Sequence, residues 1–255
     1  MTTFNRKPVF AAVIDMFGQL QQPQVDRLDA AIDAGLGILA PVPARQIGLT
    51  SADFSEVAGA LGCTVAQIRA VWEVESGGGW FTDVRTDILA SDGPGGFIDG
   101  PHLPKILFEA HIFDRETGGR FRASHPNLSS ARWNRKLYVG GSAEWLRLNK
   151  AMQLDRRAAL RSASVGGAQI MGFNHKLAGF DTVEAFWEAM KVSERAHLDA
   201  FAAFIRNNNL LTALRQISNY HAACVPFASG YNGTGYAANA YHIKIAQAHA
   251  KWSAI

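Results

Sequence analysis

The chain has 255 residues, of which 48% are hydrophobic and 18% charged, and its formal net charge is +3. A chain of this length buries a full core, either as one large domain or as one domain with an appendage. The charge is too small, and no Lys/Arg stripe is dense enough, to predict binding to nucleic acid. A mildly basic balance fits a solvated surface or an approach to an anionic polymer.

The cysteines and the N-terminal region give two further expectations. Cys63 and Cys224 occur without a CxxC pair or a metal-like spacing to histidine, so we expect reduced, partly buried thiols and no metal site. The apolar run "PVFAAVIDMFG" is interrupted by Asp15 and is far shorter than the ~20 residues that span a bilayer. No small-residue cleavage site follows it, so we expect neither a signal peptide nor stable membrane insertion.

Residues 1–45 are predicted to form a short helical segment of their own. The stretches "PVFAAVIDMFGQL" and "PQVDRLDAAIDAGL" both have apolar residues at helical spacing. Because roughly 45 residues are marginal for an independent core, we expect a docked hairpin or an accessory module. Pro41 and Pro43 predict a linker, and residues 46–255 form the main domain.

The main domain is predicted to be mainly α, with at most a small β-hairpin between residues 77 and 108. Helical periodicity is strongest in "TSADFSEVAGALG", "TVAQIRAVWEVES" and "EAFWEAMK", and a last helix follows "GYNGTGY". Residues that end or begin these helices are of the usual capping types. The expected caps are Ser51, Thr64 and Ser142 as N-caps, Gly62 as a C-cap, and Asp181 with Glu184 as a capping box.

Glu75 lies in the middle of the apolar arc of the predicted helix "TVAQIRAVWEVES". With successive residues ~100° apart, Glu75 is about 20° from Ile68, whereas Glu73 points about 140° away. The other members of this arc, all within ~60° of Ile68, are Val65, Val71 and Trp72. Burial raises the pKa of a carboxyl group, as a general acid for glycoside cleavage requires. The alternative is a structural glutamate that pairs with an arginine or caps a neighbouring helix.

Ser76 and three consecutive glycines follow Glu75 directly and end the helix. The carboxyl group therefore stands at a helix terminus beside a glycine-rich loop, where side chains leave the backbone accessible. This position suits the floor of a cleft.

The motifs "VESGGGWF", "ASVGGAQIMGFN" and "FASGYNGTGYAANAYHIKI" resemble, in this order, those of the lysozyme-like superfamily. The stretches "GALGCTVAQIRAVWEVESGGGWF", "PKILFEAHIFDRETGGRF" and "HPNLSSARWNRKLYVGGSAEWLRL" resemble more closely the N-acetylmuramidase domain of modular phage endolysins. The resemblance covers roughly residues 48–253. It implies a lysozyme-like α+β domain that cuts the β-1,4 bond between N-acetylmuramic acid and N-acetylglucosamine in peptidoglycan, without a metal or organic cofactor.

The stretch "SVGGAQIMGFNH", residues 164–175, carries no lysine, arginine, aspartate or glutamate. Gly166 and Gly167 remove side chains, and Gln169 supplies a donor and an acceptor, which suits binding to sugar hydroxyls and acetamides. The resemblance implies that this stretch and the Tyr-Asn-Gly loop line the saccharide cleft. The substrate-binding residues it implies are Ser76, Gly166, Gly167, Gln169, Ile170, Met171, Asn174, Tyr231 and Asn232. The alternatives are a tight helix start with buried amides and, for Tyr231, a core aromatic whose hydroxyl caps a turn.

Hydrolysis with inversion needs a second carboxylate about 6.5–9.5 Å from the acid, to activate water. Glu109 in "ILFEAHIF" is the candidate base, because it lies among apolar residues and the resemblance includes this motif. Asp83, Asp87 and Asp92 are alternatives on the loop after Glu75. That loop is longer than the family pattern, so the identity of the base stays open.

Two other functions remain open at this stage. With Glu75 alone acting as acid and then base, the 6-hydroxyl of the sugar would attack, and the enzyme would be a lytic transglycosylase that leaves 1,6-anhydro-muramic ends. A non-catalytic wall-binding or virion-associated module could keep the fold as a scaffold. Trp80, Trp133 and Trp145 are candidates for stacking on sugar faces, with core packing as the alternative for Trp145.

The resemblance also implies a setting. We expect a monomer, made in a host cytoplasm without a signal peptide, that reaches peptidoglycan glycan strands in the periplasm after a holin-type pore opens the membrane. Nucleic acid is not an expected partner.

Overall fold

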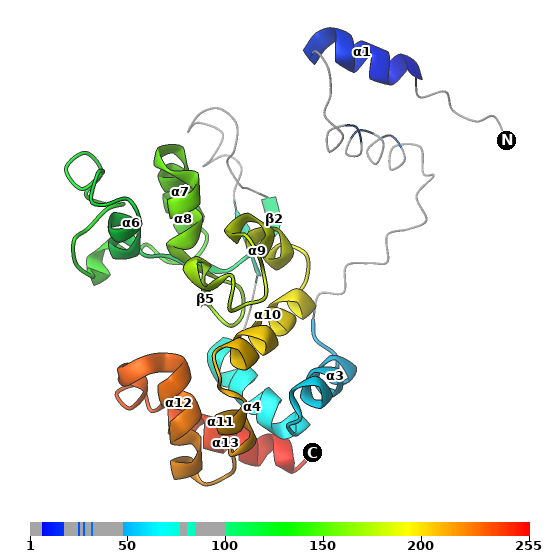
Figure 1. Ribbon diagram of the computed structural model, residues 1–255, viewed down its shortest axis with the longest axis vertical. Coiled ribbons are helices and arrows are strands. Elements are labelled where there is room, and N and C mark those ends of the chain that lie inside the picture. Colours follow the sequence, from blue (N-terminus) through cyan, green and yellow to red (C-terminus); the bar gives the residue numbers. More distant parts are fainter. Residues whose placement is uncertain are drawn as a thin grey trace, which may run out of the picture. The chain divides into compact units, whose positions relative to one another are not determined.

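The computed structural model describes residues 7–17, 25, 28, 32, 48–76, 81–84 and 100–255 (Figure 1). Contacts within the chain divide it into two units, Met1–Gln46 and Ile47–Ile255. In the first unit, helix α1 (Lys7–Phe17) corresponds to the first predicted helix. Most of the second predicted helix, and the predicted linker with Pro41 and Pro43, lie outside the described residues.

The second unit is mainly helical, as predicted, and its described residues also contain two small antiparallel sheets. Its α-helices are α3 (Ser51–Leu61), α4 (Val65–Ser76), α6 (Ala110–Glu116), α7 (Ala143–Leu154), α8 (Arg156–Arg161), α9 (Val183–Met190), α10 (Glu194–Asn207), α11 (Leu211–Arg215), α12 (Val225–Asn232) and α13 (Tyr241–Ser253). Short 3-10 turns are η2 (Arg135–Leu137), η3 (Gly172–Asn174), η4 (His221–Cys224) and η5 (Gly233–Tyr236). In the ranges that the structure describes, no helix is both long and apolar enough to cross a membrane.

The N-cap of helix α3 lies one residue before the predicted one. Thr50, not Ser51, is the N-cap, because Asp53 three residues later completes a reciprocal capping box with it. The helix ends at Gly62 in the left-handed conformation, as predicted, with φ +61°. The next cap is also as predicted: the Thr64 hydroxyl accepts a hydrogen bond from the backbone N–H of Gln67 at 3.1 Å.

The other two predicted caps differ in detail. Helix α9 is capped by Thr182, whose hydroxyl accepts from the N–H of Ala185, instead of by the predicted pair of Asp181 and Glu184. Ser142 occupies the N-cap position of α7, but its side chain makes no capping hydrogen bond.

The first sheet is the hairpin predicted between residues 77 and 108, and it pairs β1 (Phe81–Val84) with β2 (Gly100–Pro104). The second sheet, in the order β3-β4-β5, was not predicted. It consists of β3 (Ile106–Phe108), β4 (Ala163–Val165) and β5 (Ile170–Met171). Strands of two or three residues are too short to show an alternating pattern, so periodicity does not find them.

The core of the second unit is formed by side chains of α4, of the strands and of the helices packed around them. Helix α13 packs along α4, and α10 connects the group α6–α9 to the group α11–α13 (Figure 1). Trp145 is fully buried and meets Trp187 edge to face at 5.6 Å, so its predicted core role is confirmed. This packing fixes the last turn of α4, where Glu75 lies.

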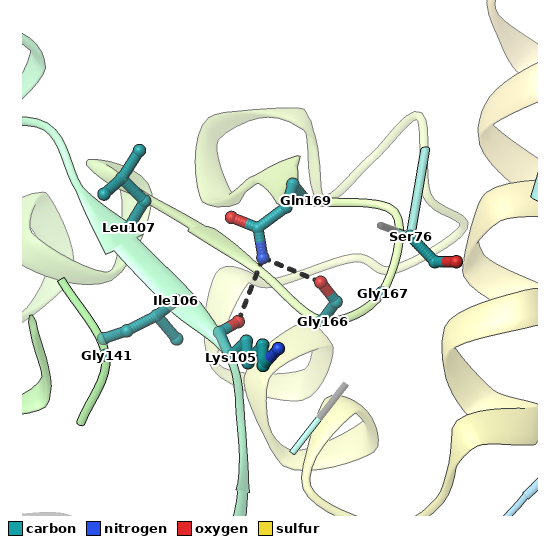
Figure 2. Close-up of a pocket in the computed structure, with 8 residues that line it drawn as sticks. All are labelled: Ser76, Lys105, Ile106, Leu107, Gly141, Gly166, Gly167 and Gln169. Carbon is teal, nitrogen blue, oxygen red and sulfur yellow. Dashed lines mark hydrogen bonds between the residues drawn. The ribbon is translucent and has the colours of Figure 1, made fainter. Parts of the chain in front are cut away.

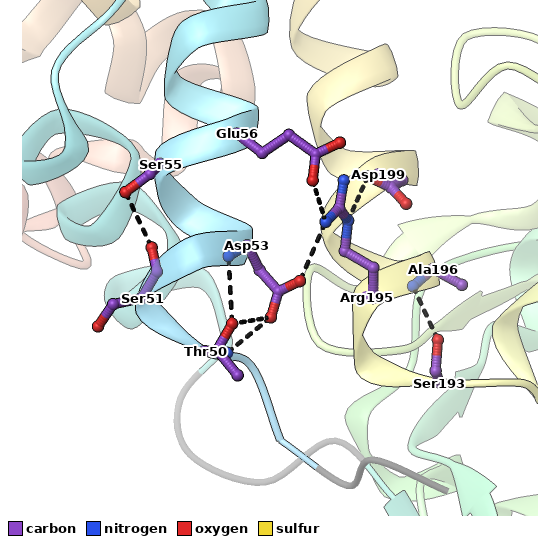
Figure 3. Close-up of polar contacts among 9 residues, drawn as sticks. All are labelled: Thr50, Ser51, Asp53, Ser55, Glu56, Ser193, Arg195, Ala196 and Asp199. Atoms are coloured by element: carbon purple, nitrogen blue, oxygen red, sulfur yellow. Dashed lines mark hydrogen bonds and ion pairs between the residues drawn. The ribbon is translucent and has the colours of Figure 1, made fainter. Parts of the chain in front are cut away.

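Arg195 joins α10 to α3 at the surface of this unit (Figure 3). Its guanidinium donates to Asp53 at 3.0 Å and to Glu56 at 2.8 Å, both on α3, and to Asp199 on its own helix at 2.8 Å. Thr50 and Arg195 together hold the pKa of the Asp53 carboxyl group below its usual range. Asp53 therefore serves both as a helix cap and as a link between two helices.

Candidate active site

A cavity of about 330 Å³ lies beside the end of α4 (Figure 2). It is bounded by that helix end, by β3 and the residue before it, by the start of α7, and by the turn between β4 and β5. Its lining residues are Ser76, Lys105, Ile106, Leu107, Gly141, Gly166, Gly167 and Gln169. Four of these were proposed to bind substrate. Ser76 is one of them, and the other three, Gly166, Gly167 and Gln169, lie about 90 residues later in the sequence.

Glu75 precedes the lining residue Ser76 in the last turn of α4. Burial raises the pKa of its carboxyl group to about 7, while a hydrogen bond from Asn232 acts in the opposite direction. The amide nitrogen Nδ2 of Asn232 donates to Oε1 of Glu75 at 3.0 Å. Two residues predicted to belong to one site, 157 positions apart, are therefore in direct contact.

The apolar arc predicted for α4 is largely as observed. Its buried members are Ile68, Val71 and Trp72. Val65 is an exception, with 36% of its surface exposed, because it starts the helix. Glu73 faces outward as predicted, and its carboxylate accepts from Nζ of Lys251 and Nε1 of Trp252, each at 2.8 Å.

The glycine turn between β4 and β5 is backed by His197 of α10, which the sequence analysis did not single out. His197 is 1% exposed, and its Nδ1 accepts from the N–H of Gly167 at 3.2 Å. Because Nε2 lies 2.7 Å from the carbonyl oxygen of Met190, we assign the proton to Nε2. Gly166 has φ +78°, and a Cβ there would come within 3.1 Å of the His197 ring. The turn therefore needs glycine both for its backbone conformation and for the close approach of the ring.

The Gln169 side chain is held by the protein itself. Its Nε2 donates to the carbonyl oxygens of Gly166 at 2.8 Å and Lys105 at 3.2 Å, as Figure 2 shows. Its Oε1 accepts from the Ser164 hydroxyl at 2.8 Å. Both amide hydrogens are thus used to join β3 to the turn, and one lone pair of Oε1 is left for a ligand. Gln169 adopts a left-handed backbone conformation, with φ +48°.

The rest of this stretch lies next to the cavity wall without lining it. Ile170 is buried and Met171 half-buried on β5, and Asn174 is half-buried in the turn η3. A Cβ at Gly172 would come within 1.9 Å of the carbonyl oxygen of Leu160, so only glycine fits there. Ile170, Met171 and Asn174 therefore lie behind the cavity wall. That they contact the substrate stays a prediction.

Tyr231 connects the candidate acid to the same wall. Its hydroxyl donates to the carbonyl oxygen of Ala168 at 2.9 Å, and its ring packs against Phe201, Phe204 and Phe227. Burial, and secondarily the Glu75 charge, raise the pKa of this hydroxyl well above its usual value. The geometry agrees with the alternative reading, a core aromatic whose hydroxyl holds a turn.

Glu109 lies directly after β3, at the N-cap position of α6. Its Oε2 accepts from the Tyr138 hydroxyl at 2.5 Å and lies 3.2 Å from Nδ1 of His111. It is half-buried and does not line the cavity. Of the alternative bases, Asp83 lies on β1 with an undescribed side chain, and Asp87 and Asp92 lie outside the described residues.

A buried ion pair that the sequence analysis missed holds two walls of the cavity. Glu144 is fully buried, and its carboxylate accepts from Arg147, from the N–H of Phe108, and from two backbone N–H groups at Val139 and Gly140. These segments continue into the lining residues Leu107 and Gly141. Glu144 precedes Leu148 by one helical turn and so falls on the apolar side of α7. The pattern that singled out Glu75 was therefore present here too.

The comparisons with known proteins agree with the motif resemblance. The family described as N-acetylmuramidase matches residues 64–253, a range that contains every candidate residue of the site. The crystal structure of Burkholderia AP3 phage endolysin is similar to this chain, with a TM-score of 0.67 and 35% sequence identity. The match covers 88% of this chain and 76% of that chain. No curated protein matches the sequence.

Proposed function

Because the chain belongs to the N-acetylmuramidase family, whose members are glycoside hydrolases of peptidoglycan, we propose that Glu75 is its general acid. The bond cleaved is the β-1,4 bond between N-acetylmuramic acid and N-acetylglucosamine. The observation that carries this proposal is the position of Glu75, which is half-buried, directly precedes the lining residue Ser76 and is bonded to Asn232; burial there raises the pKa of its carboxyl group to about 7. At neutral pH roughly half of such carboxyl groups hold the proton that a leaving sugar needs.

The bond from Asn232 specifies which oxygen carries this proton. Because Oε1 of Glu75 accepts from Nδ2 of Asn232, we assign the acidic hydrogen to Oε2, from which it would pass to the glycosidic oxygen. When the proton leaves, the negative charge on Glu75 strengthens the same hydrogen bond. Asn232 therefore orients the acid before the reaction and stabilises the carboxylate after it.

The cavity wall supplies binding groups without a fixed negative charge. Gly166 and Gly167 let a sugar ring approach the backbone, and the remaining lone pair of Gln169 Oε1 can accept from a sugar hydroxyl or acetamide. Lys105 is the charged residue among the lining residues. This wall suits a neutral, hydroxyl-rich glycan.

For the attack on the anomeric carbon we propose a single inverting displacement by water, in which Glu109 takes the proton from the water as Glu75 protonates the leaving oxygen. Glu109 follows β3, whose preceding residue Lys105 and first residues Ile106 and Leu107 line the cavity. Its side chain is oriented by the Tyr138 hydroxyl. An inverting mechanism requires about 6.5–9.5 Å between the two carboxyl groups, which leaves room for one water molecule.

The bonds that Glu109 makes to Tyr138 and His111 also favour a second candidate mechanism. If these partners keep Glu109 from activating water, Glu75 acts first as acid and then as base. The 6-hydroxyl of muramic acid then attacks its own anomeric carbon, and the protein is a lytic transglycosylase. The two mechanisms release different sugar ends.

Mass spectrometry of muropeptides released from purified peptidoglycan tests the proposal. Wild-type protein should release reducing-end muramic acid, and Glu75→Gln should lower the rate by about 10²–10⁴-fold. Anhydro-muramic ends would establish the transglycosylase. If Glu75→Gln released as much as the wild type, Glu75 would not be the acid. A comparable loss in Glu109→Gln, with the same ends as residual product, would support Glu109 as the base.

We propose further that the enzyme acts as a monomer in the periplasm, which it reaches through a holin-type pore, and that residues 1–45 are accessory to a catalytic domain at 46–255. Removing residues 1–44 tests whether the N-terminal segment is accessory to the catalytic domain. Loss of wall pelleting with full activity on soluble glycan would make the segment a wall-binding module. Loss of solubility would make it part of the fold.

A further inference from the structure

Residues 132–138 place aromatic and positively charged side chains on one exposed segment. Trp133 is 60% exposed, and its ring centroid lies 6.3 Å from that of Tyr138, with 51° between the ring planes. Arg132, Arg135 and Lys136 are exposed, and none of the ion pairs found in the described ranges involves them. We call these five residues the aromatic–cationic surface.

This surface is held in a defined conformation. The side chain of Asn134 accepts from the N–H of Lys136 at 3.0 Å and starts the turn η2. The Tyr138 hydroxyl donates to Glu109, and the backbone N–H groups of the next two residues donate to the buried carboxylate of Glu144. An exposed tryptophan on an anchored segment loses little conformational entropy when a ligand covers it.

The aromatic–cationic surface borders the cavity. Gly141, three residues after Tyr138, lines the cavity, and Tyr138 contacts the candidate base Glu109. A glycan strand that leaves the cavity past Gly141 therefore passes this segment. The lining residues of the cavity include one cation, Lys105, and residues 164–175 contain no lysine or arginine, so most of the positive charge near the cavity lies on this segment.

We infer that the aromatic–cationic surface binds the peptide-bearing part of the glycan strand beyond the cavity. Trp133 would stack on a sugar ring, and Arg132, Arg135 and Lys136 would bind the carboxylates of the stem peptides attached to muramic acid. This inference rests on the proposed function, because it takes peptidoglycan as the substrate. It assigns recognition of sugar rings to the cavity and recognition of peptide charge to the neighbouring surface.

An anionic membrane would also attract three cations, but the apolar part of this segment is small. Its exposed large apolar side chains are Trp133 and Val139, the latter 59% exposed. Stable interfacial binding uses a long amphipathic helix with a wide apolar face, and η2 has three residues. The glycan strand is therefore the occupant that the geometry favours.

Pelleting assays with the Glu75→Gln protein separate binding from cleavage. The surface variant carries Arg132→Gln, Arg135→Gln and Lys136→Gln. The matched control carries Arg156→Gln, Arg157→Gln and Lys176→Gln, three exposed cations elsewhere in the unit. Each protein is mixed with intact peptidoglycan, with the same peptidoglycan after its free carboxyl groups have been converted to methylamides, and with phosphatidylglycerol vesicles. Thermal unfolding checks that every variant is folded.

We expect the surface variant to bind intact peptidoglycan at least about fivefold more weakly than the control variant does, and to bind the amidated peptidoglycan equally well. Trp133→Ala should weaken binding to both forms of the peptidoglycan. Equal weakening by the control variant, or equal weakening on the amidated peptidoglycan, would overturn the inference. The inference would also be overturned if the surface variant lost binding to vesicles alone, because the surface would then be a membrane contact. Failure of the proposed function would appear instead in the sugar ends released by the wild type, which these assays do not measure.

Discussion

Asn232 donates a hydrogen bond from Nδ2 to Oε1 of Glu75 across 3.0 Å, and so joins the end of α12 to the last turn of α4. It is the polar partner that lowers the pKa of Glu75, against the larger effect of burial. The position of the Glu75 carboxyl group and its proton affinity are therefore set by two segments far apart in sequence.

Removing this amide should shift the activity profile. In Asn232→Ala the pKa of Glu75 rises above about 7, because burial acts alone, and the alkaline limb of the pH–rate profile moves to higher pH. The maximal rate should fall about tenfold or more, since the carboxylate formed in the reaction loses a charge-assisted hydrogen bond. Asn239→Ala is the control, because Asn239 is exposed and its Nδ2 donates to the carbonyl oxygen of Gly235. An unchanged alkaline limb would mean that Asn232 does not act on the acid.

The pKa of Glu75 also predicts how stability depends on pH. Its folded value of about 7 lies above the value of about 4.3 expected in the unfolded chain, so the folded state binds the proton more tightly. The stabilisation by this proton is complete below about pH 4.3 and is lost as the pH rises through about 7. Glu75→Gln removes this dependence.

Urea denaturation at pH 5 and pH 8 measures the difference. Relative to wild type, Glu75→Gln should gain up to about 3 kcal/mol of unfolding free energy between the two pH values, at 1.36 kcal/mol for each pKa unit. Glu73→Gln is the matched control, because Glu73 is exposed and bonded to Lys251. If both variants followed the same pH dependence as wild type, burial would not have raised the pKa of Glu75.

The glycine turn offers a test with a matched pair of glycines. Gly166 and Gly118 have φ values of +78° and +61°, so alanine is strained at both. A Cβ at Gly118 meets nothing within 4 Å, whereas at Gly166 it would contact the His197 ring at 3.1 Å. Gly118→Ala should therefore cost about 1–2 kcal/mol of stability and leave KM unchanged.

Gly166→Ala should lose more stability and also raise KM, because the ring of His197 and the hydrogen bond from Gly167 must shift together with the cavity wall. Steady-state kinetics on peptidoglycan strands and urea denaturation separate the two effects. A KM equal to that of Gly118→Ala would show that this turn does not contact substrate.

The features that the sequence predicted well are local ones. Apolar spacing and capping types predicted α3, α4, α7, α9 and α13, and the same spacing placed Glu75 on the side of α4 that carries the buried Ile68 and Trp72. The error at Thr50 is one residue, because two hydroxyl residues stand side by side and Asp53 selects between them. The sheet β3-β4-β5 has no periodic signal, since its strands are held by pairing with distant residues.

What the sequence did not predict is which residues hold the predicted site residues in place. Gln169 was expected to offer its amide to sugar, but Lys105 and Gly166 use both of its hydrogens. His197 lies four residues before the buried Phe201 on α10 and is itself buried behind the glycine turn. A polar residue on the apolar face of a helix indicates a buried side chain that needs a hydrogen-bond partner. The sequence does not say which residue that partner is, because the partner is distant in the chain.

Glu144 is the clearest example of this rule, and it predicts a large loss of stability. In Glu144→Gln the Arg147 guanidinium stays buried, 8% exposed, without its carboxylate partner. Breaking a buried pair in this way costs about 3–5 kcal/mol, because the one amide oxygen of glutamine can accept either from the N–H groups of Val139 and Gly140 or from Phe108 and Arg147, but not from both sets. The double variant Glu144→Gln with Arg147→Met should recover part of this loss, because no buried charge is left unpaired. Urea denaturation of the wild type, the two single variants and the double variant measures the coupling, and a loss in the double variant equal to the sum of the two single losses would mean that the pair does not act as a unit.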